Sequence, residues 1–295
     1  MNKFFFLKFP PKLRGVWGVI FFVLVLNSFY FIPKYAEAAV LSKAPNNLGL
    51  VGYWSMNEGV GAKAGDSSGK GNRGTITGAT WTSGKHGKAL SFNGVNDYVS
   101  ISNNITLTSP SFCAWVKKTT TAPTGNQGIV LKYDWGTNQR VAQLFMDGQA
   151  TPGRLSFITS SNGTIQSGNI VYSIGNSYAD NKWHHVCGIY DNIYNRIYID
   201  GVLDNSVDRT NDGIFSTSLL SVIGSQWANG IPDVAASHFN GLIDDVRIYN
   251  RALTASEVKA LYQSGAAKIN ASSADLDNGG TLSNGLVGLW TFDGK

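Results

Sequence analysis

Turn-forming dipeptides recur at short intervals along the chain, and they constrain its fold most strongly. Each one follows or separates a run rich in β-branched and aromatic residues, and alternating helical segments are missing. Many short strands at this spacing indicate an antiparallel sandwich or barrel. The dipeptides are Asn93-Gly94, Asp147-Gly148, Asn162-Gly163, Asp200-Gly201, Asp212-Gly213, Asn229-Gly230 and Asn240-Gly241.

The most distinct hairpin surrounds Asp200-Gly201, which separates residues 195–199 from Val202-Leu203. Asp-Gly favours the two positive φ angles of a type I′ turn, whose twist matches that of the flanking strands. We therefore expect two consecutive antiparallel strands here.

One short helix is expected after the last strand. Thr254 and Glu257 have the spacing of a capping box, with Thr254 as N-cap. Residues 258–262 then supply a single apolar stripe, and Gly265 is a plausible stop. A helix of this kind is expected to pack on the surface of the sandwich.

The N-terminal segment predicts export. Residues 1–14 carry four basic and no acidic side chains, residues 15–32 are apolar, and Ala36-Glu37-Ala38 resembles a cleavage site. We expect a signal peptide over residues 1–38. The alternative is an uncleaved membrane anchor, because about 18 apolar residues can just span a bilayer. In both cases we expect the rest of the chain to be secreted or at the cell surface, with membrane contact only through this segment if it is uncleaved.

The net charge of the chain comes mostly from that segment. The whole chain has a formal charge of +5, from 24 basic and 19 acidic residues. Residues 1–38 hold five of the bases and one of the acids, which leaves a net charge of +1 for the remainder. No basic run remains there, so a nucleic-acid partner is not expected.

The chain has two cysteines, Cys113 and Cys187, each within a strand-like apolar run. In an oxidising compartment, two cysteines on separate strands most simply form one disulfide. The bridge would close a loop of about 75 residues and stabilise the fold by roughly 4 kcal/mol on the chain-entropy model. Two buried free thiols are the alternative.

The C-terminal residues echo the start of the predicted domain. Residues 285–294 (GLVGLWTFDG) resemble residues 49–58 (GLVGYWSMNE) at an offset of 236 residues. We expect one domain over residues 46–265, a small polar linker over 266–283, and the first strand of an incomplete second repeat over 284–295. Truncation is the preferred explanation, and pairing of this strand with a neighbouring sheet edge is the alternative.

Six segments of the chain form an ordered pattern: LVGYWSMNEG (50–59), DSSGKGNRGT (66–75), GKALSFNGVNDYV (87–99), WHHV (183–186), IDG (199–201) and FNGLIDDVRIYNRAL (239–253). This pattern resembles the LamG-like jelly-roll domain of the concanavalin A-like lectin/glucanase superfamily over residues 48–265. The resemblance implies an all-β fold, a two-sheet antiparallel jelly-roll sandwich with one concave sheet. It also implies a binding rather than a catalytic role, and we add one short C-terminal helix from the capping signal.

The chain is also similar, more distantly, to pentraxins. Their single disulfide joins strands that correspond to those of Cys113 and Cys187, so the resemblance implies this pairing. Their calcium-dependent ligand site is matched here by Asn96 and Asp97. Its acid-rich second half is matched only by Gln226, and two pentraxin-type calcium ions are therefore not expected.

A structural calcium is the metal prediction. The loop from Asp66 to Gly74 offers the Asp66 carboxylate, free carbonyls and the Asn72 amide, and LamG-like domains often hold one calcium near such a loop and the last long strand. On that strand Asp244 is in phase with Val246 and is expected to point inward. A buried carboxylate needs a partner, which could be calcium. The alternative is that Asp66 and Asp244 accept backbone N–H bonds in turns.

Aromatic residues at loops are the ligand prediction. Asp134-Trp135 and Gln226-Trp227 each place a Trp beside turn residues, with a carboxylate or amide next to it. Sugars are recognised by stacking on rings and by hydrogen bonds, so both loops are candidates for ligand contact together with Asn96 and Asp97. The alternative is that each Trp only covers the core.

Catalysis is not expected. Retaining glycosidases of this fold need two carboxylates about 5–5.5 Å apart. The chain contains only Glu37, Glu58 and Glu257, which lie in the signal peptide, after the first strand and in the helix cap. His184-His185 point to opposite faces of a strand and are expected to be structural.

The sequence thus predicts a non-catalytic extracellular binding or adhesion module. It would recognise glycan on the concave face or the edge loops, with a structural calcium. The alternative is a protein-interaction or spacer module of a tandem-repeat surface protein, and a glycoside hydrolase is a remote one.

Overall fold

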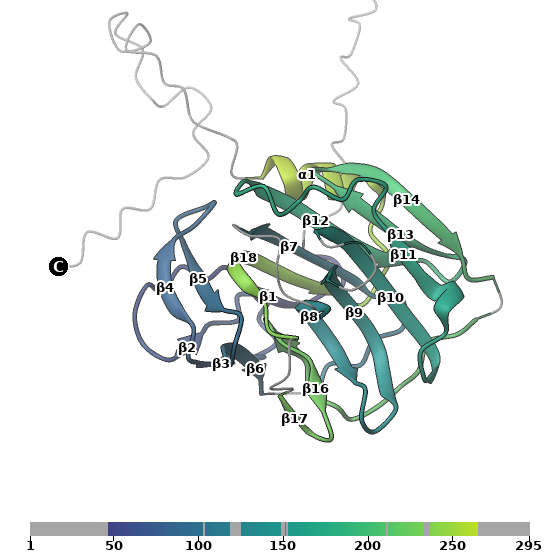
Figure 1. Cartoon of the computed structure of the whole chain (residues 1–295), viewed down its shortest axis with the longest axis horizontal. Helices are drawn as coiled ribbons and strands as arrows, with labels where there is room; N and C mark the ends of the chain where they lie inside the picture. The colour runs from purple at the N-terminus through teal and green to yellow at the C-terminus, as the bar shows by residue number, and fades with distance from the viewer. Residues whose placement is uncertain are drawn as a thin grey trace, which may run out of the picture. The chain divides into compact units, whose positions relative to one another are not determined.

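Two sheets stacked face to face form the part of the chain that the structure describes (Figure 1). The structure is a computed structural model that describes residues 47–102, 104–118, 125–148, 151, 153–210, 212–232 and 237–264. All of these belong to the unit Lys43–Lys295, which is distinct from Met1–Ser42. The predicted signal peptide, the linker, the C-terminal repeat segment and Gly265 lie outside the described residues.

The first sheet has eight strands in the described residues. Strand β18 is central to it and pairs antiparallel with β1, β5 and β7. Its strands in spatial order are β14 (Val202–Asp208), β13 (Tyr194–Ile199), β12 (Trp183–Tyr190), β7 (Ser111–Lys117), β18 (Asn240–Tyr249), β5 (Lys88–Asn93) and β4 (Thr80–Ser83), with β1 (Leu50–Trp54) beside β18.

The second sheet has ten strands in the same described ranges. Two short strands, β16 and β17, branch from β8, and β16 makes a parallel contact with it. The strands in order are β11 (Ile170–Tyr172), β10 (Arg154–Gly163), β9 (Gln139–Asp147), β8 (Gln127–Asp134), β15 (Val222–Ile223), β6 (Tyr98–Ile101), β3 (Gly74–Thr77) and β2 (Lys63–Ala64), with β16 (Trp227–Ala228) and β17 (Ile231–Pro232).

The hydrophobic core lies between the two sheets. Alternate residues of each strand point into it, such as Phe112 and Val116 of β7 against Leu144 of β9 and Phe157 of β10. Trp54 is fully buried there, and its Nε1 donates a hydrogen bond of 2.8 Å to the carbonyl of Asn72. This architecture confirms the predicted all-β jelly-roll sandwich.

The predicted hairpin is present. Asp200 and Gly201 connect β13 to β14 with φ angles of +50° and +82°, the left-handed conformation that a type I′ turn requires.

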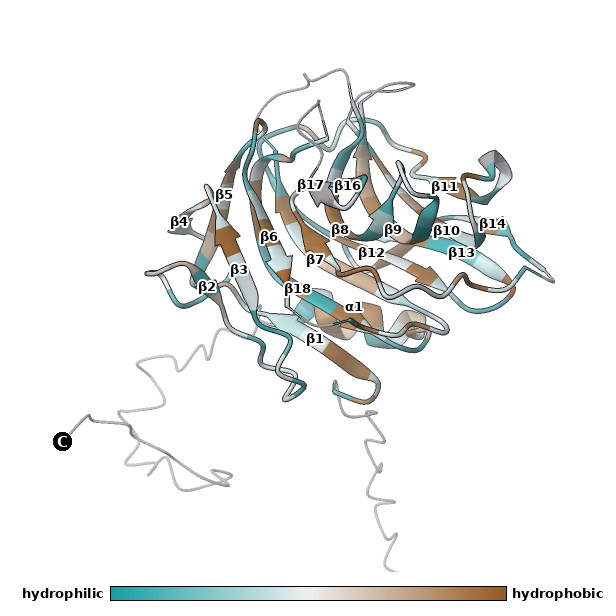
Figure 2. Ribbon diagram, turned by 90° about the horizontal axis from the view of Figure 1, so that it is seen from below, coloured by the Kyte–Doolittle hydropathy of each residue, from teal (hydrophilic) through white to brown (hydrophobic). Residues whose placement is uncertain are grey.

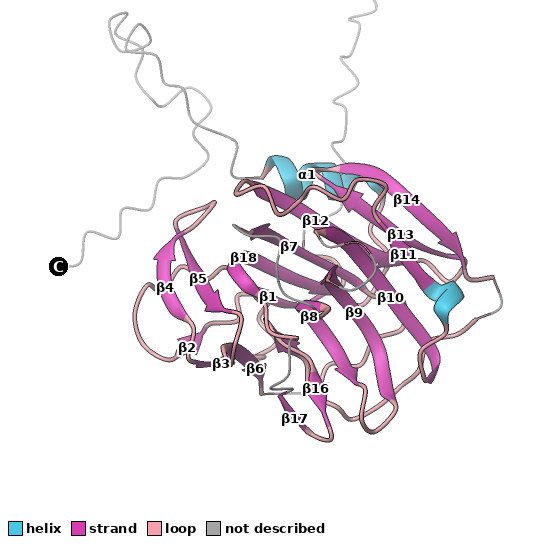
Figure 3. Ribbon diagram, in the orientation of Figure 1, coloured by secondary structure: helices cyan, strands magenta, loops and turns pink. Residues whose placement is uncertain are grey.

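One short helix, α1 (Ala255–Gln263), follows β18, and Figure 3 shows how little other helix accompanies the strands. The only other one described is a 3₁₀ turn, η1 (Ser167–Asn169). The capping box is confirmed: the N–H of Glu257 donates to Thr254 Oγ1 at 3.3 Å, and the N–H of Thr254 donates to Glu257 Oε2 at 2.8 Å. Within the described residues, no helix has the length and apolar character needed to cross a membrane.

Helix α1 covers the outer face of the eight-stranded sheet, beside β1 and β18 (Figure 2). Val258 and Leu261 of the helix are buried against Leu50 of β1 and Tyr249 of β18. The outer face of this sheet therefore has its own small core. That second core also contains the two cysteines.

The predicted disulfide is confirmed. Cys113 of β7 and Cys187 of β12 are directly opposite in the antiparallel register, with Cα atoms 4.2 Å apart, and their sulfurs are bonded. No free cysteine remains in the chain, which has only these two.

Replacing both cysteines by alanine is expected to lower the free energy of unfolding by roughly 4 kcal/mol. Without the cross-link between residues 74 positions apart, the unfolded chain gains conformational entropy. Urea denaturation of both proteins measures this. Thiol labelling of the unreduced, unfolded wild type is the control, and labelling of both cysteines would contradict the disulfide.

Candidate ligand-binding site

The structure brings together four of the predicted ligand residues where β8 meets β16. Asp134 ends β8 and pairs with Trp227 of β16 in parallel register. The backbone N–H of Trp135 donates to the carbonyl of Trp227 at 3.2 Å. Gln226 directly precedes β16, so the two loops that the sequence singles out separately form one edge of the ten-stranded sheet.

The Asp134 carboxylate holds these loops in place and is not available to a ligand. Asp134 is 1 % exposed. Its Oδ1 accepts hydrogen bonds from the N–H groups of Gly136 at 2.9 Å, Thr137 at 3.2 Å and Asn229 at 3.0 Å, and its Oδ2 accepts from Gly230 at 2.8 Å. Four backbone donors on one carboxylate tie the turn after β8 to the turn after β16.

A second brace comes from Arg140 of β9. Its Nη2 donates to the carbonyl of Trp135 at 2.7 Å, and its Nη1 donates to the carbonyl of Gly163 at 3.2 Å. Its Nε reaches the hydroxyl of Tyr133 at 3.2 Å. Gly136 completes the tight packing, because an added Cβ would lie 2.3 Å from Asn229 Oδ1. The turn of residues 134–140, here called the Trp135 loop, is thus fixed on both sides.

The two tryptophans of this edge have different surroundings. Trp135 is 45 % exposed and stands at the surface of the Trp135 loop. Trp227 is partly buried and packs against Leu131, Tyr133 and Val222 on the outer face of the ten-stranded sheet. Trp227 therefore fits the alternative that it covers the core, while Trp135 is the more exposed of the two rings.

The other predicted ligand residues, Gln226, Asn96 and Asp97, each make a hydrogen bond to another group of the protein. Gln226 is mostly buried, and its Nε2 donates to the carbonyl of Asn126 at 3.4 Å. In the turn between β5 and β6, Asp97 Oδ2 accepts from the N–H of Asn93 at 2.8 Å, and Asn96 Oδ1 accepts from the side chain of Asn93 at 2.8 Å. Tyr98, next to Asp97, packs on the same apolar group as Trp227. The two parts of the predicted pentraxin-like site, Asn96-Asp97 and Gln226, thus lie next to residues of one apolar cluster on the outer face of the sheet.

Of the predicted calcium ligands, Asp66 and Asn72 lie in one hydrogen-bonded loop. The Asp66 oxygens accept from the N–H groups of Tyr53, Ser68 and Asn72, at 2.8–3.0 Å, and from the hydroxyl of Ser68. Burial alone would raise the pKa of Asp66, but these hydrogen bonds hold it below its usual value. The Asn72 amide donates to the carbonyl of Val51. Both side chains thus have protein partners, as the turn alternative predicts.

Asp244 is held by a different segment, and its predicted inward orientation is wrong. A β-bulge at Asp245, whose φ is +51°, shifts the register between Asp244 and Arg247. Asp244 is therefore opposite Trp115 on the outer face of the eight-stranded sheet, the face that also carries Arg247. Simple alternation fails here because the bulge adds one residue.

The Asp244 carboxylate is fully buried but only half satisfied. Its Oδ2 accepts from the N–H groups of Lys85 at 2.8 Å and His86 at 3.0 Å, and its Oδ1 has no hydrogen-bond partner. Burial raises the pKa of Asp244 to about 7. Asp66 and Asn72 are thus held in the loop between β2 and β3, and Asp244 is held at the turn of Lys85 and His86.

The raised pKa of Asp244 predicts a pH-dependent stability. Between the usual pKa near 4 and about 7, the unfolded chain loses a proton that the folded chain keeps, so the free energy of unfolding falls as pH rises through this window. Asp244→Asn keeps an acceptor for the N–H groups of Lys85 and His86 but cannot titrate. The free energy of unfolding of the variant minus that of the wild type should therefore increase by roughly 2–4 kcal/mol from pH 4 to pH 8. Urea denaturation across this range measures the difference, with Asp208→Asn at an exposed position as control. A difference independent of pH would contradict it.

The calcium prediction has a direct test. Because both Asp66 oxygens accept hydrogen bonds from protein donors, we expect EDTA to leave the Tm unchanged. A Tm that falls in EDTA, and is restored by calcium but not by magnesium, would instead support a structural calcium ion.

Comparison with known proteins identifies the family. A family model described as the concanavalin A-like lectin/glucanases superfamily matches residues 92–259, more than half of the chain. A search of curated proteins found no match.

Solved structures share the fold. Domain 4 of an extracellular arabinanase from Geobacillus stearothermophilus, in complex with arabinotriose, is 23 % identical with a TM-score of 0.53, over 72 % of this chain and 98 % of that one. The binding domain of Paraclostridial Mosquitocidal Protein 1 is 18 % identical with a TM-score of 0.57, over 74 % of this chain and 53 % of that one. The ligand-binding domain of botulinum neurotoxin serotype D, in complex with N-acetylneuraminic acid, is 15 % identical with a TM-score of 0.54, over 74 % and 51 %.

This chain spans only about half the length of each toxin domain. At these identities the solved structures support the two-sheet fold, and the family match covers its central strands. The chain belongs to the concanavalin A-like lectin/glucanase superfamily.

Proposed function

We propose that this protein is a non-catalytic extracellular module that binds glycan through the Trp135 loop. The observation that carries the proposal is a half-exposed indole on a loop that is rigid before any ligand arrives. Trp135 is 45 % exposed, while the carboxylate beneath it accepts four backbone hydrogen bonds.

Rigidity matters because each contact between a protein and a sugar contributes little binding free energy. A flat ring stacks on the apolar face of a pyranose or furanose, and any freedom lost by the ring on binding reduces the affinity. Asp134 and Arg140 fix the backbone of Trp135 from both sides, so little ordering remains to be done at binding. In this proposal Asp134 positions the loop and Trp135 contacts the sugar.

The solved structures support a sugar ligand. The arabinanase domain, which this chain matches over nearly all of its length, is complexed with arabinotriose. The toxin domain, which it matches over about half of its length, is complexed with N-acetylneuraminic acid. For this chain we propose glycan as the ligand class, secretion or display at the cell surface, and no hydrolytic activity.

Two observations support the absence of hydrolysis. Both glutamates in the described residues have structural roles: Glu58 accepts from the N–H of Gly65, and Glu257 caps α1 and pairs with Arg251. In the Trp135 loop, Asp134 is buried beneath its four donors. A retaining glycosidase needs two carboxylates facing the substrate. Among the described residues of the Trp135 loop, Asp134 is the only carboxylate, and it is 1 % exposed.

Trp135→Ala is expected to reduce glycan binding at least about tenfold, because a stacked aromatic ring supplies one of the main contacts. Trp135→Phe should retain part of the affinity. The matched control is Leu203→Ala on β14, since Leu203 is 46 % exposed and lies on the other sheet. A glycan array that includes arabino-oligosaccharides and sialylated glycans, followed by calorimetry on the hits, measures the effect.

Glycan binding that survives Trp135→Ala unchanged would rule out this loop as the site. An array without any hit, for a folded wild type, would favour the alternative of a protein-interaction or spacer module. The echo of residues 49–58 in residues 285–294 is the sequence observation that favours that alternative, because it indicates a tandem arrangement.

A further inference from the structure

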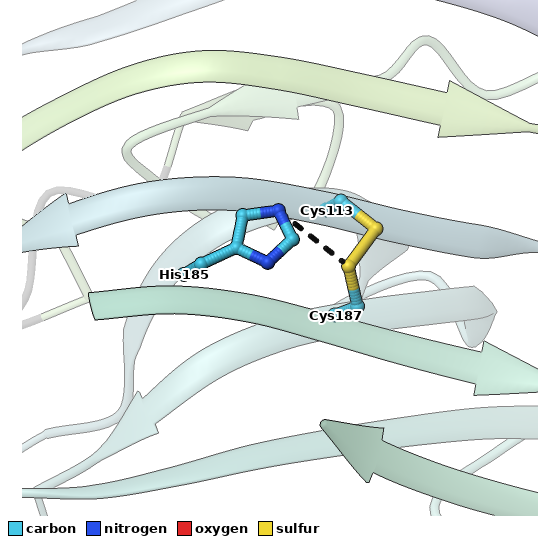
Figure 4. A group of neighbouring side chains, drawn as sticks. All are labelled: Cys113, His185 and Cys187. Carbon is cyan, nitrogen blue, oxygen red and sulfur yellow. Dashed lines mark hydrogen bonds between the residues drawn. A yellow bond between two sulfur atoms is a disulfide. The ribbon is translucent and has the colours of Figure 1, made fainter. Parts of the chain in front are cut away.

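Three side chains with metal-ligating atoms meet on the outer face of the eight-stranded sheet, whereas the Trp135 loop belongs to the ten-stranded sheet. They are Cys113 of β7 and His185 and Cys187 of β12, and their ligand atoms all lie within 4.8 Å of one another. Figure 4 shows the imidazole of His185 directed at the disulfide, with Nε2 at 3.9 Å from the sulfur of Cys187.

The strand register brings them together. Cys187 is directly opposite Cys113 across the β7–β12 pair, and His185 is opposite Trp115 two residues along. Side chains two residues apart on a strand share a face, so His185 and Cys187 point the same way. The sequence predicts a structural role for His185, because its neighbour His184 faces the other side of the strand.

The group is closed to solvent. Cys113 and Cys187 are 0 % exposed and His185 is 1 % exposed. The Nε2 atom of His185 faces the sulfur of Cys187, and its Nδ1 atom is buried without a hydrogen-bond partner among the described residues. Arg247 is opposite Cys113 in the β7–β18 register, and its guanidinium pairs with Asp245 at 3.5 Å.

We propose that, when the disulfide is reduced, Cys113, Cys187 and His185 form a three-ligand site for Cu(I). Two soft thiolates and one imidazole select a thiophilic ion. Zinc held by three protein ligands takes a water molecule as its fourth, whereas this group is closed to solvent and no further His, Cys, Asp or Glu of the described residues joins it. Cu(I) accepts three.

The disulfide and the metal ion exclude one another, because both use the same two sulfurs. An external dithiol reduces the bridge by exchange: the dithiol becomes a cyclic disulfide, and Cys113 and Cys187 each gain an S–H. Binding of Cu(I) then forms two Cu–S bonds and one Cu–N bond and releases both thiol protons to solvent. The resulting site carries one net negative charge.

The experiment uses the full chain, reduced in denaturant and refolded without oxygen. Near-ultraviolet circular dichroism reports whether the aromatic packing has returned. Cu(I) is then titrated in competition with a chromogenic Cu(I) chelator, and X-ray absorption identifies the ligating atoms. The variants are Cys113→Ser, Cys187→Ser and His185→Gln, with His238→Gln as control because His238 is equally buried but hydrogen-bonds to Asp97.

We expect one Cu(I) per reduced chain, bound by two sulfurs and one nitrogen, and none bound by the disulfide form at this site. Each Ser variant should abolish this binding, and His185→Gln should weaken it at least about tenfold, while His238→Gln leaves it unchanged. A reduced chain that refolds only with Cu(I) would also support the site. Coordination by sulfur alone that is insensitive to His185, or a reduced chain that binds no Cu(I), would overturn the proposal.

Discussion

Strand β18 holds the sandwich together. It pairs antiparallel with three strands, β1, β5 and β7, and so joins the N-terminal strand to the middle of the eight-stranded sheet. Its inner face places Ile243, Val246 and Ile248 in the main core, and its outer face places Tyr249 against α1. Loss of β18 would leave three strands with unpaired edges and two cores open.

The bulge in β18 decides what that outer face contains. One added residue at Asp245 turns Asp244 to the side of Trp115 and Arg247. A carboxylate that alternation assigns to the core is thereby buried between layers, where burial keeps its pKa near 7. The turn at Lys85 and His86 satisfies only one of its oxygens.

The two proposed sites use opposite sides of the same fold. The Trp135 loop lies at an edge of the ten-stranded sheet, where buried polar groups hold an aromatic ring at the surface. The cysteine–histidine group lies on the outer face of the other sheet, in the layer that α1 covers. The first is accessible and preorganised, which suits a weak ligand in solution. The second is closed, so its chemistry depends on the redox state of the bridge.

Local signals in the sequence determined the strands, the type I′ hairpin at Asp200-Gly201, the capped helix and the family, because propensity, turn chemistry and capping act over a few residues. Two cysteines on separate strands favoured the disulfide, with two buried free thiols as the alternative, and the structure decided between them. Three features were decided only by the tertiary structure. The bulge in β18 reversed the orientation of Asp244, the parallel β8–β16 contact made Asp134 a scaffold instead of a ligand, and the β7–β12 register placed His185 beside Cys187. Each depends on which residues of distant segments are opposite one another, and a periodic pattern within one strand does not contain that register.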